Sequence, residues 1–225
     1  MNKIDNDTYI IAHGDSKLDY VPEFIDYISQ YSNVIYSSWD DTPEHIIGLL
    51  KRKSILFTLN PYPEKEGMSK LGYQQAGFLN GLKLAKIYGA KFIYKMRNDL
   101  IIDNLHIILK NLKHKIQFLP NSKEIQLLCW DNLCNGPCDF CIFGSVKEME
   151  IYWSFKDLDK PSERYILPQY FAAKNISYDF TYKSMLQLCQ TYIQDQFSVP
   201  ININWLKNND ESPLQEHFAN RVIYL

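Results

Sequence analysis

The chain has 225 residues, 46% of them hydrophobic and 14% aromatic, which is enough apolar side chain for a sizeable core and too much for a disordered protein. Its 24 basic and 26 acidic residues leave a formal charge of -2, so no overall positive field attracts nucleic acid or anionic lipid. No stretch approaches the ~18 apolar residues that span a bilayer, and the first residues lack a signal-like apolar run. We therefore expect one soluble, cytoplasmic domain that binds anions only locally.

The first 60 residues alternate between predicted strands and helices. Runs of β-branched and aromatic residues at 9–12, 34–36 and 54–59 predict three strands. Helical spacing from Val21 predicts a helix after the first strand, and Thr42-Pro43-Glu44 predicts the start of another that ends near Leu50. This alternation predicts an α/β fold with a mostly parallel central sheet covered by helices.

The pattern continues through most of the remaining chain. A helix is expected over 69–87 with Gly89 as its stop, followed by a strand at 92–96 and a helix at 105–112 with Asp103 as its N-cap. Weaker patterns predict strands at 125–130 and 140–143 and helices at 146–155 and 162–173. We expect a single Rossmann-like domain over 1–225, with a core at about 9–175 and an extension at 176–225 that packs on it.

Polar residues follow several of the predicted strands. The strand at 92–96 contains Lys95 and is followed by Arg97, Asn98 and Asp99. The first strand is followed by His-Gly-Asp at 13–15. Ligands of open α/β sheets bind beyond the carboxyl ends of the strands, so these residues are candidates for a phosphate and metal site. The simpler interpretation of Asp99 taken alone is a solvated turn.

Four cysteines lie between Cys129 and Cys141. Cys134, Cys138 and Cys141 have a C-x3-C-x2-C spacing that resembles the iron–sulfur signature of radical SAM enzymes, although too little chain follows for the rest of such a barrel. Together with Cys129 they can instead form a zinc site. We rank first a third interpretation, in which Cys141 is a small hydrophobic residue of a buried strand.

Three stretches of the chain resemble the WavE-like lipopolysaccharide synthesis proteins, which look like GT-A glycosyltransferases. They are Ser37-Ser38-Trp39, then Gln75 with residues 80–82 and 95–100, and finally residues 139–144 with Tyr152-Trp153. The family shows Lys-x-Arg-Thr/Ser-Asp-Leu where this chain has Lys-Met-Arg-Asn-Asp-Leu at 95–100, so position 98 departs. Its Arg-Gln is replaced here by Gln-Gln at 74–75. The cysteines lie in a segment where the family usually shows Ser-Asp-Trp-x-x-x-Gly. This favours the interpretation of the cysteines as strand residues over a metal cluster.

The resemblance implies a glycosyltransferase with a GT-A-like domain that moves a sugar from a nucleoside-diphosphate sugar, a UDP-sugar first, to a glycan or lipid-linked saccharide. It implies that Asp99 binds Mn²⁺ or Mg²⁺, which neutralises the diphosphate, with Asn98 as a weaker contact. Asp139 is the first candidate for the general base and Glu163 the second. The residues implied in nucleotide binding are His13, Gly14, Asp15, Ser38, Trp39, Gln75, Lys95, Arg97 and Asn98. For Lys95, a salt bridge within the fold is nearly as well supported as contact with phosphate.

Two other functions stay open at this stage. The departure at Asn98 and the lack of a full Asp-x-Asp favour a non-catalytic GT-A-like module that binds glycan or a partner protein. The cysteine spacing keeps an iron–sulfur protein as a third option. We expect a cytoplasmic protein, with a peripheral position at the membrane as the alternative.

Overall fold

Four neighbouring strands of a six-stranded sheet are parallel to one another. The computed structural model describes residues 4–118, 125–127, 130–131, 136–137, 141–159, 162–176 and 203–205. In chain order the parallel strands are β1 (Thr8–His13), β2 (Val34–Trp39), β3 (Leu56–Asn60) and β4 (Phe92–Arg97). β1 pairs in parallel with both β2 and β4, and β2 pairs in parallel with β3.

The order of the strands across the sheet is β3-β2-β1-β4-β9-β6. β9 (Cys141–Ser145) is antiparallel to β4, and β6 (Ile125–Leu127) is antiparallel to β9. The predicted α/β, Rossmann-like fold with a mostly parallel sheet is therefore confirmed. The order reverses between β1 and β4, because β2 and β3 continue on one side of β1 and β4 lies on the other. Such a switch point is where open α/β sheets bind ligands.

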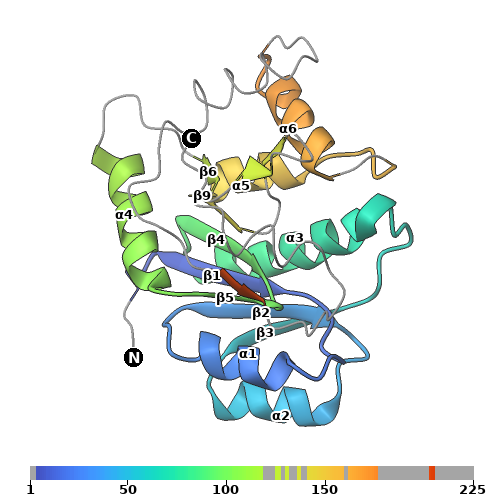
Figure 1. Ribbon diagram of the computed structural model, residues 1–225, viewed down its shortest axis with the longest axis vertical. Helices are drawn as coiled ribbons and strands as arrows, with labels where there is room; N and C mark the ends of the chain where they lie inside the picture. Colours follow the sequence, from blue (N-terminus) through green and yellow to red (C-terminus); the bar gives the residue numbers. More distant parts are fainter. Residues whose placement is uncertain are drawn as a thin grey trace.

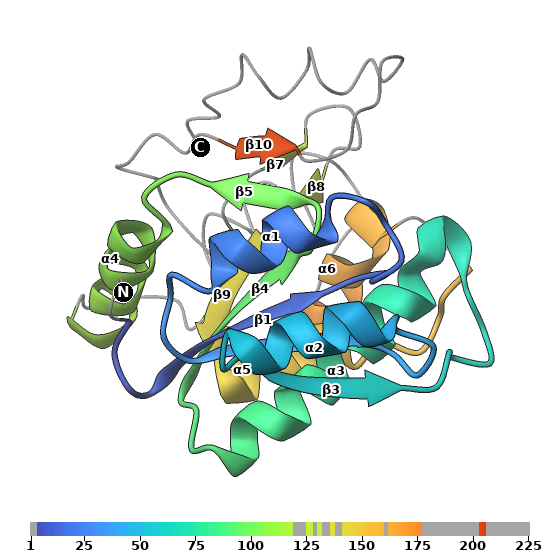
Figure 2. The ribbon, with the colours of Figure 1, turned by 90° about the horizontal axis from the view of Figure 1, so that it is seen from below.

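Helices cover both faces of this sheet (Figure 1 and Figure 2). The helices that share one core cluster are α1 (Val21–Ile28), α2 (Glu44–Arg52) and α4 (Leu105–Phe118). The opposite face carries α3 (Leu71–Ile87), α5 (Val146–Trp153) and α6 (Ser162–Ala173). The short 3-10 helix η1 (Met68–Lys70) leads into α3.

Side-chain alternation along the strands separates the two cores. In β1, Ile10 and Ala12 join the cluster with α1 and α2, whereas Tyr9 and Ile11 join the cluster with α3. Successive strand residues point to opposite faces, so a strand buried on both sides becomes apolar throughout. Gly81 allows α3 to lie very close to β1, since a Cβ there would be 2.5 Å from Cγ2 of Ile11.

The short elements were the least predictable. β5 (Leu100–Ile102) was not predicted, and it pairs in antiparallel register with β10 (Ile203–Trp205), which brings part of the 176–225 segment beside the core. Two further short strands, β7 (Trp130–Asp131) and β8 (Gly136–Pro137), pair with each other. α4 begins at Leu105, directly after Asn104 with its φ of 56°, rather than after an Asp103 cap.

Within the described ranges, no helix is both long and apolar enough to cross a membrane.

The close packing of α3 on β1 can be tested with Gly81→Ala. Alanine normally stabilises a helix relative to glycine by up to ~1 kcal/mol, but here the added methyl group collides with Ile11, and overpacking costs about 1–3 kcal/mol. The control is Gly48→Ala in α2, where a Cβ would meet only the end of the Arg52 side chain at 3.4 Å. Urea unfolding should show a loss of stability for Gly81→Ala alone. Equal stabilisation of both variants would contradict the close approach.

Candidate functional site

A cleft of about 400 Å³ opens at the carboxyl ends of β1, β2 and β4, at the switch point of the sheet. Its walls come from the turn after β1, the ends of β2 and β4, the loop after β3 and the start of α3. The lining residues are His13, Gly14, Asp15, Leu18, Tyr20, Trp39, Tyr62, Lys70, Tyr73, Gln74, Arg97, Asn98 and Asp99. Sequence-distant polar ends of strands are thus brought together by the parallel arrangement.

Asn98 ties the end of β4 to the turn after β1. Its backbone N–H donates to the carbonyl of His13 at 3.0 Å, and its Nδ2 donates to the carbonyl of Asp15 at 2.8 Å and to Oη of Tyr36 at 2.9 Å. The approach requires glycine at position 14, because a Cβ there would be 2.0 Å from Oδ1 of Asn98 and the φ is +155°. Asn98 is 4% exposed, so its amide chiefly fixes the floor of the cleft.

Arg97 and Asp99 form a two-point ion pair on the β4 side of the cleft. Nε of Arg97 donates to Oδ1 of Asp99 at 3.0 Å, and Nη2 donates to Oδ2 at 2.5 Å. The Asp99 side chain is 2% exposed and the Arg97 side chain is 29% exposed. The carboxylate is therefore enclosed, while the guanidinium still reaches the cleft. A planar fork of this kind is also suited to phosphate.

The metal ion implied by the family resemblance fits these residues poorly. Both oxygens of Asp99 already accept hydrogen bonds from Arg97. The other carboxylate of the cleft is Asp15, whose Oδ1 accepts the backbone N–H of Lys17 at 2.9 Å. In the part of the chain that the structure describes, no group of three His, Cys, Asp or Glu side chains lies close enough together to hold a metal ion. Mn²⁺ or Mg²⁺ at Asp99 stays a prediction.

His13 is a buried, neutral group at the base of the cleft. Burial holds its pKa well below the ordinary value, and the positive charges of Lys95 and Arg97 act in the same direction. Nε2 of His13 has no hydrogen-bond partner although the atom is buried. His13 therefore lines the base of the cleft without adding charge to it.

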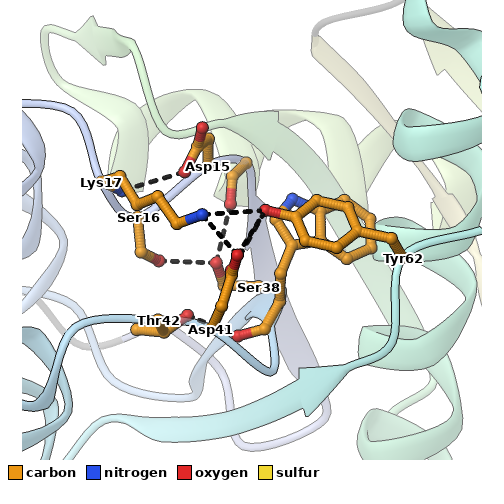
Figure 3. Close-up of polar contacts among 9 residues, drawn as sticks. Asp15, Ser16, Lys17, Ser38, Asp41, Thr42 and Tyr62 are labelled. Carbon is orange, nitrogen blue, oxygen red and sulfur yellow. Dashed lines mark hydrogen bonds and ion pairs between the residues drawn. The ribbon is translucent and has the colours of Figure 1, made fainter.

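Three aromatic side chains make an apolar wall on the β2 and β3 side. The rings of Trp39 and Tyr62 stack with centroids 5.0 Å apart, and Tyr73 contacts both rings at 5.5 and 5.7 Å. Figure 3 shows Tyr62 held at the rim, where its Oη donates to Oδ1 of Asp41 at 3.0 Å and Lys17 pairs with the same carboxylate. The hydrogen bond from Lys17 also lowers the pKa of Asp41. This wall is suited to a planar ring or a sugar face.

The amino end of α3 contributes positive potential to the cleft. Lys70 precedes the helix, and Tyr73 and Gln74 belong to its first turn, so this end faces the cleft. The formal charges of the charged lining residues, Lys70 and Arg97 against Asp15 and Asp99, cancel. A helix N-terminus carries roughly half a positive charge, which favours an anion in the space between them.

Most of the residues implied in binding meet in this cleft. Those that line it are His13, Gly14, Asp15, Trp39, Arg97, Asn98 and Asp99. Ser38, Gln75 and Lys95 lie outside its lining and have roles within the fold. Oγ of Ser38 donates to the carbonyl of Gly14 at 2.9 Å, and Nε2 of Gln75 donates to two carbonyl oxygens at the end of α5.

Lys95 is fully buried beneath α3. Its Nζ donates to Oε1 of Gln74 at 3.1 Å and lies 4.2 Å from the centre of the Trp153 ring. Lys95 and Arg97 share a face of β4 and Met96 takes the other, as strand alternation predicted. These contacts agree better with a role of Lys95 inside the fold than with direct binding of phosphate by Lys95.

Several predicted residues lie outside the described parts of the chain. They are Asp139, Cys129, Cys134 and Cys138. The backbone of Cys141 begins β9, opposite Met96 of β4, which is the predicted strand position. Glu163 belongs to the first turn of α6, but its side chain is not among those described.

Of the apolar wall, the sequence identified Trp39 but not Tyr62 or Tyr73. Tyr62 follows the break after β3, and Tyr73 occupies a helical position that reads as part of an apolar helix face. A usable signal was present, since Asn60-Pro61-Tyr62 also follows a parallel strand and its residues therefore share the edge with 13–15 and 97–99.

The buried histidine predicts a pH dependence of stability. The unfolded chain takes up a proton at this histidine near pH 6.5, whereas folded His13 stays neutral to lower pH. The free energy of unfolding therefore falls as the pH drops below about 6.5, by up to ~1.4 kcal/mol per pH unit for this group. His13→Gln should remove this part of the slope between about pH 6.5 and 5. Urea unfolding across that range measures it, with exposed His45→Gln as the control, and an unchanged slope in His13→Gln would contradict a neutral His13.

Comparisons with known proteins add little to this geometry. No family model matches the chain, and no curated protein matches it. Among solved structures it is similar to HddC from Yersinia pseudotuberculosis complexed with GMP-PN, with 13% sequence identity and a TM-score of 0.40 over 72% of this chain and 85% of that chain. A likeness this weak does not indicate a shared function.

Proposed function

We propose that the protein is a glycosyltransferase that binds a nucleoside-diphosphate sugar in this cleft and passes the sugar to a glycan or lipid-linked saccharide. The main support is that the apolar wall of Trp39, Tyr62 and Tyr73 and the guanidinium of Arg97 line the same cleft. Its volume of about 400 Å³ falls within the usual range of ligand pockets, about 300–1,000 Å³.

The spacing of the strands matches the parts of such a donor. β2 and β4 flank β1, so their ends are separated by about 9–10 Å. A base or ribose against the apolar wall would extend its phosphates across the end of β1 towards Arg97. His13 and the turn at Gly14–Asp15 lie between the two, where a ribose or the first phosphate would pass.

Charge supports the same orientation. As the bond between sugar and diphosphate breaks, the diphosphate oxygens gain negative charge, and fixed donors that face them lower the barrier. Arg97 and the amino end of α3 supply this positive potential. Because both belong to regular elements packed on the sheet, they need little rearrangement when the donor binds.

The acceptor side of the reaction requires a base in an inverting enzyme. β9 begins at Cys141, opposite Met96 near the carboxyl end of β4, so the chain enters β9 on the cleft edge of the sheet. Asp139 is two residues earlier in the sequence and remains our first candidate for the base. Glu163, in the first turn of α6, remains the second.

Donor binding can be tested by thermal unfolding with a panel of UDP, GDP, CDP and ADP and their sugar derivatives, each with and without Mn²⁺. A nucleotide at ~100 times its Kd stabilises the protein by about 2.7 kcal/mol. Tyr62→Leu should weaken binding of that nucleotide, because a stacked base contributes ~1–3 kcal/mol. Tyr88→Leu is the control, since Tyr88 is an exposed aromatic beyond the far end of α3. No shift with any nucleotide would reject the transferase and favour a binding module.

The base assignment can be tested with Asp139→Asn and Glu163→Gln. The variant that removes the base should lower sugar transfer by about 10²–10⁴-fold, whereas nucleotide binding stays the same. Release of nucleoside diphosphate measures transfer, and calorimetric titration measures binding. We expect the loss in Asp139→Asn. A loss in Glu163→Gln alone would move the role to Glu163, and full transfer in both variants would exclude both residues.

A further inference from the structure

The ion pair on the β4 side of the cleft bears on how the diphosphate is held. A carboxylate that serves a metal must direct its oxygens at the ion, at about 2.0–2.1 Å for Mg²⁺. Here both oxygens of Asp99 are directed at Arg97, and the carboxylate is enclosed on all but 2% of its surface. A metal ion on Asp99 would have to displace a guanidinium that already neutralises it.

Displacement is disfavoured by the surroundings of the pair. Opening a buried ion pair leaves a charge without its partner in a poorly solvated place. The backbone beside it is fixed, since the neighbouring Asn98 is bound to His13, Asp15 and Tyr36. Arg97 therefore has a defined position before any ligand enters.

We infer that Arg97, held by Asp99, is the cation that binds the diphosphate, and that nucleotide binding in this cleft needs no divalent metal. This inference rests on the proposed function. The ion pair engages the donors on Nε and Nη2 of the planar guanidinium. The side chain lines the cleft and is 29% exposed, so phosphate can approach it without breaking the pair. Asp99 is then a positioning residue rather than a metal ligand.

The test is calorimetric titration of the full chain with the nucleoside diphosphate that binds best, once with EDTA and once with Mn²⁺. For the unmodified protein the two Kd values should agree within about threefold, less than 0.7 kcal/mol. Arg97→Gln should weaken binding at least ~10-fold, or 1.4 kcal/mol, in both buffers. Arg97→Lys should also weaken it, because a point charge cannot replace the fork. Arg52→Gln removes the same charge from the last turn of α2 and should change nothing.

The outcomes separate this inference from the proposed function. Nucleotide binding that appears only with Mn²⁺ would overturn the inference and leave the proposed function standing. Binding that needs no metal but is unchanged in Arg97→Gln would also overturn it, because another group would then hold the phosphates. If no nucleotide binds in either buffer, the proposed function fails and the inference fails with it. The comparison in the unmodified protein needs no variant, so a folding defect in Arg97→Gln cannot hide the answer.

Discussion

The site depends on the hydrogen bonds that Asn98 makes across the switch point of the sheet. β1 and β4 are neighbours, and their parallel register places His13 opposite Arg97. Asn98 then bonds the backbone of the turn after β1 at two places and the hydroxyl of Tyr36 at a third. These contacts fix the two polar loops relative to each other. The strand pairing positions Arg97, and the contacts of Asn98 add a fixed position for the turn that faces it.

The charge of the cleft follows from this arrangement. The buried carboxylate of Asp99 would destabilise the fold if it had no partner of opposite charge. Arg97 is that partner, and part of its side chain remains exposed in the cleft. Burial holds the pKa of His13 well below its ordinary value, and the positive charges of Lys95 and Arg97 act in the same direction. The proposed anion binding therefore relies on one oriented guanidinium and a helix end, rather than on an excess of basic residues. This agrees with a chain whose formal charge is only -2.

The sequence predicted the central sheet well because its signals are local. Apolar runs of three to six residues that end in polar turns, with amphipathic helices between them, marked β1 to β4 and α1 to α3. It also predicted that residues 13–15 and 97–99 would meet, because parallel strands present the same edge. It could not show that Asn98 holds a turn, that Asp99 pairs with Arg97, or that Tyr62 and Tyr73 form a wall. Those facts depend on contacts between residues far apart in sequence, which no local pattern encodes. β5 was missed for the same reason, since its partner β10 lies about a hundred residues away.

In the proposed function, one cleft holds a nucleoside diphosphate between an aromatic wall and a guanidinium. The sharpest test is a crystal structure of the protein with a bound nucleoside diphosphate, grown with Mn²⁺ present. We expect the base or ribose against Tyr62 and Trp39, the phosphates on Arg97, and an intact pair between Arg97 and Asp99. Phosphates bound through Mn²⁺ on Asp99, with Arg97 displaced, would contradict diphosphate binding by Arg97 without a metal. A nucleotide bound elsewhere would contradict the site itself.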